Sequence, residues 1–328
     1  MYICTIIIDE TSSFYMISRR LLRIKVLKGL YAHLKSESDS LMGSEKTLVA
    51  SIDKTYDLYF QMLSLIVELA HHAEQRQEAA KQKKLPTYED LNPNRKFVDN
   101  AVIRLIADSD SVNDYLAARK LSWANYPELI KTLFNQLEQS DYYQRYMTSQ
   151  ESSWKEDLEL VTAFYTNELE ESEALEDVLD EQSILWNDDL GFALIMVTRT
   201  LSNMRPSHTD VKVLPKFKSI EDLDFARELF EKAAINYDEY LEMLEEFTRN
   251  WDVERIAFMD NVILVTALAE LINCPSIPVK VTLDEYIEIA KYYSTPGSSN
   301  FINGVLDKVV ATLTEQGKIK KSGRGLIG

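Results

Sequence analysis

The side chains best placed to do chemistry near the start of this chain are six bases between residues 16 and 36, a stretch without an acidic residue. Apolar residues in the same stretch recur at steps of three and four, which predicts a helix with the bases flanking its apolar stripe. Phosphate contacts are local and are screened beyond about 8–10 Å, so such a helix can bind nucleic acid. On charge alone, a solvated surface explains the pattern equally well. The six bases are Arg19, Arg20, Arg23, Lys25, Lys28 and Lys35.

The rest of the chain is acidic. The 328 residues include 36 Lys and Arg against 53 Asp and Glu, a net charge of −17. Fourteen acids and one base fall within residues 151–190. A basic end closes the chain, with Lys318, Lys320, Lys321 and Arg324. A uniformly acidic protein would be a poor binder of nucleic acid, whereas one with a concentrated basic helix can still bind it.

Catalytic and metal-binding patterns are missing from the sequence. Cys4 and Cys274 are the two cysteines, which excludes a cysteine-based zinc site and fits a reducing compartment. His71 and His72 are adjacent and cannot share one helical face, as ligands spaced by four residues would. The calcium-loop-like start at Asp108 fails at its later positions. We therefore expect no enzyme, no metal and no cofactor.

Helical periodicity dominates the chain. Gly and Pro number 9 and 8, roughly 3 % and 2 %, where about 7 % and 5 % is usual. So few chain breakers favour long helices and predict an all-α fold. The expected helices cover residues 45–83, 95–107, 110–121, 127–147, 152–180, 187–203, 220–248, 252–272, 282–293 and 299–315, with a break at 82–94 and a loop at 206–219.

The C-terminal third carries the most specific pattern. Thr282 and Glu285 stand three apart before an apolar helix, the spacing of a capping box. A turn with Pro296 and Gly297 follows, and then a helix opened by Ser298 or Ser299 as its cap. This second helix reads Phe301-Ile302-Asn303-Gly304-Val305-Leu306-Asp307.

These segments, taken in order, resemble the NusB family of bacterial transcription antitermination factors. The match to its Phe-Val-Asn-Gly-Val-Leu-Asp pattern has one conservative change. Leu283-Asp284-Glu285 stands for the family's Ile-Asn-Glu, and Ile289-Ala290-Lys291 for its Leu-Ala-Lys. Arg19-Arg20-Leu21-Leu22-Arg23, followed by Leu30-Tyr31, is similar to the family's arginine-rich first helix.

The resemblance implies a NusB-like helical bundle built from both ends of the chain. We expect an N-terminal overhang over residues 1–15, the arginine-rich helix over 16–36 and a helical insertion over 37–218. The C-terminal helices of the bundle then cover 219–316, and a basic flexible tail covers 317–328.

The resemblance also implies a function without catalysis. NusB-like proteins bind single-stranded boxA RNA of ribosomal operons with the ribosomal protein NusE, within the transcribing RNA polymerase complex in the cytoplasm. The alternative is a NusB-fold protein-interaction module, for NusE or another basic partner, with weak or lost RNA binding. The expected RNA-binding residues are Arg19, Arg20, Arg23, Lys25, Lys28, Tyr31, Phe301 and Asn303. The expected partner-binding residues are Glu270, Asp284 and Glu288.

Two rings have a second possible role. Phe301 and Tyr31 could stack on RNA bases or pack in the core, and we expect Phe301 to stack. Asn303 could hydrogen-bond a base or cap a neighbouring loop. Glu285 is expected to act as a cap rather than as a partner contact.

Overall fold

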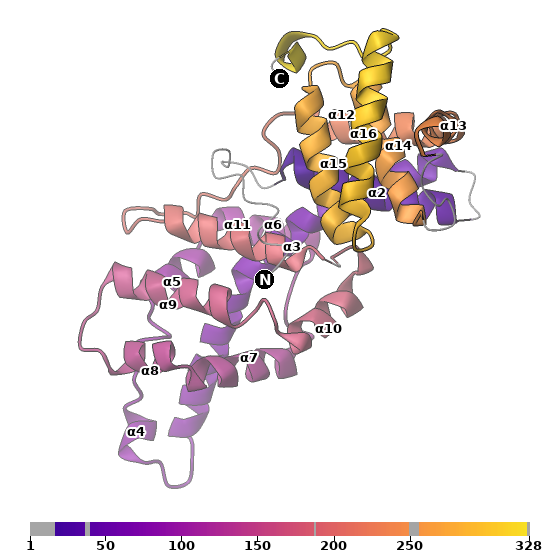
Figure 1. Cartoon of the computed structure of the whole chain (residues 1–328). Coiled ribbons are helices and arrows are strands. Elements are labelled where there is room, and N and C mark those ends of the chain that lie inside the picture. Colours follow the sequence, from indigo (N-terminus) through magenta and orange to yellow (C-terminus); the bar gives the residue numbers. More distant parts are fainter. Residues whose placement is uncertain (1–16, 37–39, 187, 249–255, 327–328) are drawn as a thin grey trace. The chain divides into compact units, whose positions relative to one another are not determined.

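The computed structural model describes residues 17–36, 40–186, 188–248 and 256–326. Within these ranges the regular elements are helices and no strand occurs (Figure 1). The all-α prediction is therefore confirmed. The expected overhang at 1–15 and the first residues of the expected helix 252–272 lie outside the described residues. Among the described residues, no helix has the length and apolar character needed to cross a lipid bilayer.

The described chain divides into two compact units. Unit 1 comprises residues 53–216, and unit 2 comprises residues 17–52 together with 217–326. The end of unit 1 falls two residues before the expected end of the insertion. Unit 1 starts at residue 53, whereas the insertion was expected to start at residue 37, because residues 40–52 belong to unit 2. There Glu45 accepts a hydrogen bond from Arg227 Nε at 2.6 Å, and Leu48 is 1 % exposed.

Unit 2 brings helices from both ends of the chain together. Its helix α2 packs against α12 and α14, α14 also packs against α13, α15 and α16, and α15 packs against α16. α14 is the central helix, and its buried face includes the polar residues Asp260, Thr266 and Glu270. Unit 2 consists of α2 (Arg19–Lys35), the first part of α3 (Leu41–Lys81), α12 (Glu221–Ile235), α13 (Tyr237–Thr248), α14 (Phe258–Asn273), α15 (Val279–Tyr293), α16 (Ser298–Glu315) and the short η3 (Gly323–Leu326).

Unit 1 is assembled around the remainder of α3. Tyr165 and Trp123 are buried, and their polar atoms donate to the α3 carbonyls of Met62, at 2.7 Å, and Gln61, at 3.0 Å. Its other helices are α4 (Tyr88–Leu91), α5 (Ala101–Ala107), α6 (Asp110–Arg119), α7 (Pro127–Gln139), α8 (Asp141–Thr148), α9 (Trp154–Asn167), α10 (Glu173–Gln182), η1 (Ile184–Trp186) and α11 (Leu190–Asn203).

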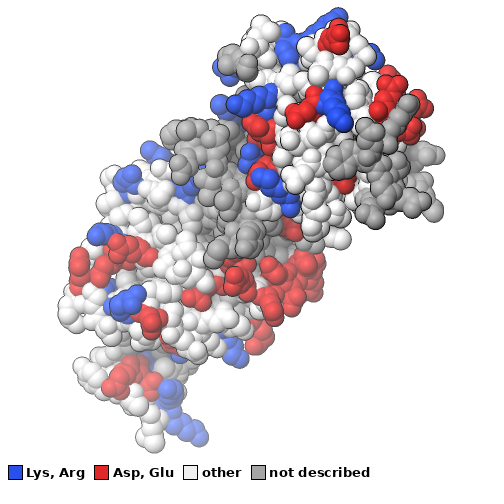
Figure 2. All heavy atoms as spheres, in the orientation of Figure 1, with Lys and Arg blue, Asp and Glu red and all other residues white. Residues whose placement is uncertain are grey.

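The acidic stretch forms amphipathic helices in unit 1. On α10, Leu175 and Leu179 are buried while the acids face solvent. Acidic side chains accordingly gather over α10 in Figure 2. These exposed acids are Glu173, Glu176, Asp177, Asp180 and Glu181.

Three expected helices are each divided in two. Ser140 ends α7 and also caps α8, with its hydroxyl accepting from the Tyr143 N–H. Asn236 separates α12 from α13, and residues 168–172 separate α9 from α10. The side chains of serine and asparagine can form hydrogen bonds with nearby backbone groups. A turn can therefore form without the Gly or Pro by which a turn is usually predicted from sequence.

Candidate nucleic-acid interface

The first half of α2 is tied into unit 2 by a buried ion pair. Arg23 donates from Nε and Nη2 to the two carboxylate oxygens of Glu270, at 2.7 and 2.8 Å, and both side chains are at most 3 % exposed. Burial alone lowers the pKa of Arg23, but the charge and hydrogen bonds of Glu270 outweigh it and raise that pKa above its ordinary value. Both groups are therefore satisfied inside the protein, as buried charges must be.

Two neighbours complete the contacts of Glu270. Thr282 Oγ1 donates to one carboxylate oxygen at 2.8 Å, and the Tyr286 hydroxyl donates to the other at 3.2 Å. Burial, with the charge of Glu270, raises the pKa of Tyr286 well above its ordinary value. The Tyr286 hydroxyl therefore keeps its proton and remains a donor to Glu270.

The expected capping box of α15 is wrong. The helix begins at Val279, with Pro278 at the N-cap, so Thr282 lies inside the helix. Its hydroxyl bonds to Glu270, and the Glu285 carboxylate binds Arg20 instead of the helix backbone. Long-range charged partners outcompete the local cap, because a charge-assisted hydrogen bond is about twice as strong as a neutral one.

The other two arginines of α2 are also paired. Arg20 donates from Nε and Nη2 to Glu285, each at 2.8 Å, and these hydrogen bonds raise the pKa of Arg20. Arg19 Nε donates to Asp222 at 3.0 Å. The side chains of Arg19 and Arg20 are 39 % and 27 % exposed, so their outer edges reach solvent while Arg23 does not.

The second half of α2 carries lysines and a tyrosine against aromatic rings. Lys28 Nζ lies 5.4 Å from the centre of the Tyr293 ring, and Lys35 Nζ lies 3.9 Å from that of Phe258. Tyr31 is 37 % exposed and meets Phe258 edge to face, with ring centroids 5.3 Å apart. We call these five residues the cation–aromatic surface. Such a group offers positive charge and partly exposed rings together, the two features that single-stranded nucleic acid needs.

A buried carboxylate positions the neighbouring turn between α15 and α16. Asp260, 3 % exposed, accepts from Ser294 Oγ at 2.5 Å and from Ser298 Oγ at 3.0 Å. Gly297 has φ = +94° and is the residue before α16, so the expected serine cap is replaced by a glycine in the left-handed region. Sequence reasoning missed Asp260, Phe258 and Tyr293, because their partners lie far away in the sequence and only the tertiary fold brings them together.

The expected RNA-binding residues do not form one exposed group. Lys25 is 4 % exposed and Phe301 is 7 % exposed, so both lie in the interior of unit 2. Phe301 was expected to stack on RNA, but it packs in the core, because its ring lies on the buried side of α16. Lys28 and Tyr31 reach the surface, and Asn303 is exposed on α16.

The expected partner-binding acids are divided in the same way. Glu270 is fully buried and holds Arg23, so it presents no surface to a partner. Asp284 is exposed on α15, and Glu288 pairs with Lys291 one turn further along that helix.

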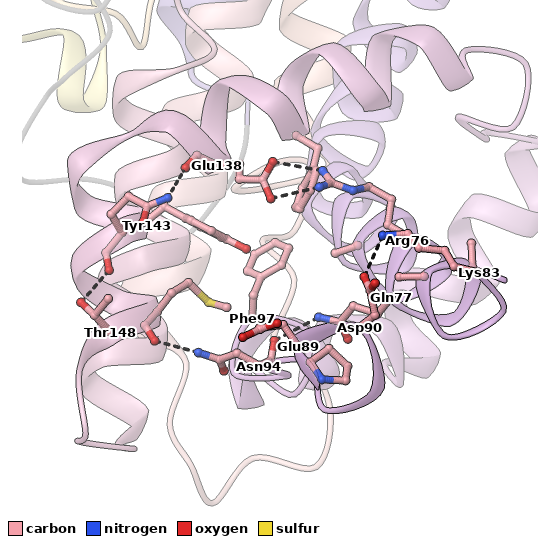
Figure 3. A pocket seen from close by; sticks show the side chains of 17 residues that line it. Arg76, Gln77, Lys83, Glu89, Asp90, Asn94, Phe97, Glu138, Tyr143 and Thr148 are labelled. Carbon is pink, nitrogen blue, oxygen red and sulfur yellow. Dashed lines mark hydrogen bonds and ion pairs between the residues drawn. The ribbon is translucent and has the colours of Figure 1, made fainter. Parts of the chain in front are cut away.

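Unit 1 contains a surface pocket of about 760 Å³, walled by Phe97, Phe134 and Tyr143 (Figure 3). Two ion pairs form among its charged residues, Arg76 with Glu138 at 3.1 Å and Lys83 with Asp90 at 2.8 Å. The described residues that line it include neither cysteine nor histidine. Elsewhere in the described part of the chain, no cluster of three His, Cys, Asp or Glu side chains could hold a metal ion.

The fold and the site define an all-helical protein in which a basic helix packs against the helices of the C-terminal third. The sequence model described as the NusB family matches residues 196–311. Among curated proteins, 37 % identity over 97 residues links the chain to "Transcription antitermination protein NusB" of Dictyoglomus turgidum, covering 30 % of this chain and 67 % of that protein. This chain belongs to the NusB family.

Two further relatives carry the same printed name. The protein of Salinibacter ruber is 46 % identical over 105 residues, or 32 % of this chain and 66 % of the relative. That of Chloroherpeton thalassium is 35 % identical over 108 residues, or 33 % of this chain and 51 % of the relative. The chain thus spans less than two thirds of the length of either. No solved structure matches it at a significant level.

Proposed function

We propose that this chain is an antitermination factor that binds single-stranded RNA of the boxA type in ribosomal operons. It acts there with the ribosomal protein NusE in the transcribing RNA polymerase complex. The role is one of binding in the cytoplasm, without catalysis or cofactor. The observation that carries the proposal is the cation–aromatic surface of unit 2, and the printed names of the relatives support it.

The proposed RNA contacts follow from what reaches solvent. Lys28 and Lys35 bind phosphates as point charges, and Tyr31 stacks on a base from its exposed side. Arg19 and Arg20 approach the backbone of the RNA with their outer edges while they keep their carboxylate partners. Arg23 acts indirectly, by holding α2 in place.

The proposed protein partner meets the exposed side of α15. Asp284 and Glu288 present negative charge there, which suits a basic ribosomal protein. Asn303 on α16 offers an amide to either the RNA or the partner.

A second candidate is a protein-interaction module of the same fold with little RNA affinity. It is favoured by the pairing of Arg19, Arg20 and Arg23 with carboxylates, and by the net charge of −17. In that case NusE or another basic protein is the partner, and unit 1 adds surface to the interaction.

Binding of fluorescent RNA distinguishes the two candidates. The probe is a boxA-like oligonucleotide, compared with a shuffled oligonucleotide of the same composition, with and without NusE and across a salt series. Antitermination predicts tighter binding of the boxA-like RNA, strengthened by NusE. Equal and weak binding of both RNAs alongside tight binding of NusE supports the interaction module.

A charge variant tests the surface itself. Lys28→Gln with Lys35→Gln is expected to make the negative slope of log K against log salt shallower by about 1.4, since each phosphate contact to a single strand contributes about −0.7. The matched control is Lys131→Gln with Lys155→Gln in unit 1, where each lysine pairs with a glutamate of its own helix. Equal slopes in the two variants would remove the cation–aromatic surface from the proposal.

A further inference from the structure

The chain beyond α16, expected from the sequence to be a flexible basic tail, makes defined hydrogen bonds with the rest of unit 2. At Gly317 the backbone turns with φ = +67°, and the Lys318 N–H donates back to the Leu313 carbonyl at 2.9 Å. Further on, the Ser322 N–H donates to the Pro275 carbonyl at 2.9 Å, and Lys321 Nζ donates to the Cys274 carbonyl at 3.0 Å. Residues 316–326, here called the anchored segment, are thus fastened to the loop between α14 and α15.

A glycine makes this attachment possible. Gly325 is buried, and a Cβ atom built on it would lie 2.0 Å from the Pro275 carbonyl oxygen. Real Cβ atoms do not approach backbone that closely, so any other residue here must push the anchored segment away from the loop. The contact depends on the absence of a side chain rather than on an unusual backbone conformation.

The anchored segment is purely basic, and two of its cations are unpaired. It contains Lys318, Lys320, Lys321 and Arg324 and no acid. Lys320 and Arg324 are exposed, and within the described chain neither forms an ion pair. Lys and Arg side chains accordingly gather at this end of unit 2 in Figure 2. This differs from α2, where each arginine is bound to a carboxylate.

We propose that the anchored segment is a second contact surface for RNA phosphates, with Lys320 and Arg324 as the contacting residues. This inference rests on the RNA-binding function proposed above and adds a site to it. Unpaired cations bind phosphate without first giving up a carboxylate, and arginine can grip two phosphate oxygens at once. Because the backbone is already held by the α14–α15 loop, little ordering entropy opposes binding.

The first test removes the two charges. Lys320→Gln with Arg324→Gln is compared with the wild-type chain for binding of a fluorescent single-stranded RNA of mixed sequence across a salt series. We expect the negative slope of log K against log salt to become shallower by about 1.4, that is by about 0.7 for each lost contact. The control is again Lys131→Gln with Lys155→Gln, which changes the net charge equally and is expected to leave the slope unchanged.

The second test releases the segment and keeps its charges. Gly325→Val is expected to weaken RNA binding by about threefold to tenfold, because the loosened segment must be ordered again on binding. Release is monitored by the reactivity of the Cys274 thiol in a Cys4→Ser background. Burial raises the pKa of Cys274 to about 12, so the native thiol reacts slowly and the released form faster.

The outcomes separate this inference from the proposed function. A wild-type chain that binds no RNA overturns both. A wild-type chain that binds RNA, with the Lys320 and Arg324 variant indistinguishable from it or from the control, overturns only the anchored segment. Undiminished binding by Gly325→Val with a reactive Cys274 overturns the role of anchoring, and with it the proposal as stated.

Discussion

Both halves of α2 carry basic residues in the sequence, but their side chains have different partners. In the first half, Arg20 and Arg23 face carboxylates of α15 and α14. In the second half, Lys28 and Lys35 lie over aromatic rings. Arg20 meets Glu285 of α15, and eight residues later Lys28 meets Tyr293 of the same helix. One helix therefore carries carboxylate-bound arginines in its first half, and in its second half the ring-contacting lysines that we propose as a binding surface.

The difference shows that a count of bases does not measure the charge available to a ligand. A guanidinium bound by a buried carboxylate contributes to the fold, and removing its partner is costly. A lysine over a ring keeps most of its charge toward solvent. The comparison predicts that variants in the first half change stability and variants in the second half change binding.

The largest effect is expected at Glu270. Glu270→Gln leaves the Arg23 guanidinium buried without its counter-charge, so the free energy of unfolding should fall by about 3–5 kcal/mol. Urea unfolding followed by circular dichroism measures this loss. The control, Glu288→Gln, breaks a more exposed pair with Lys291 and should cost at most about 1 kcal/mol. A Glu270→Gln protein as stable as the control would contradict a structural role for this pair.

Phe301 should behave as a core residue. It is 7 % exposed, so Phe301→Ala is expected to lower the free energy of unfolding by about 3–5 kcal/mol. Thermal and urea unfolding both report this change. A stability within error of the wild type, combined with a loss of RNA affinity, would instead restore the base-stacking role that its sequence position suggested.

Tyr31 should behave in the opposite way. Tyr31→Ala is expected to weaken RNA binding by about 1–3 kcal/mol, the usual value of one aromatic stacking contact. Fluorescence anisotropy measures the affinity, and the midpoint of unfolding should move little. Tyr88→Ala is a fitting control, because Tyr88 is an exposed ring of unit 1, 75 % accessible. Equal effects of the two substitutions would remove Tyr31 from the proposed interface.

The smallest effect should come from freeing Arg20. Glu285→Gln removes the carboxylate that Arg20 now holds, and the guanidinium can then turn to phosphate. We expect a gain in RNA affinity of about twofold to fivefold at low salt, with a salt slope steeper by about 0.7. An unchanged slope would mean that the first half of α2 lies away from the RNA path altogether.

Much of the fold could be predicted from the sequence, because helical periodicity is a local signal. The expected helix over 299–315 is observed as Ser298–Glu315, and that over 45–83 as Leu41–Lys81. The errors occur where local signals compete with distant ones. Thr282 and Glu285 fit a capping box, yet Glu270 and Arg20 bind them more strongly. The turn at Ser140 went unrecognised because a serine that ends one helix can also begin the next.

The sequence by itself determined the all-α class, the family and the residues with charge or aromatic character. Only the tertiary structure decided which of these residues reach solvent. Helix periodicity depends on neighbours three and four residues apart, so it can be read from the sequence. The charge of Arg23 is balanced by Glu270, which lies 247 positions away in the sequence. The anchored segment shows the same limit. The sequence revealed its four bases, but not the Pro275 carbonyl that accepts from the Ser322 N–H and leaves no room for a side chain at Gly325.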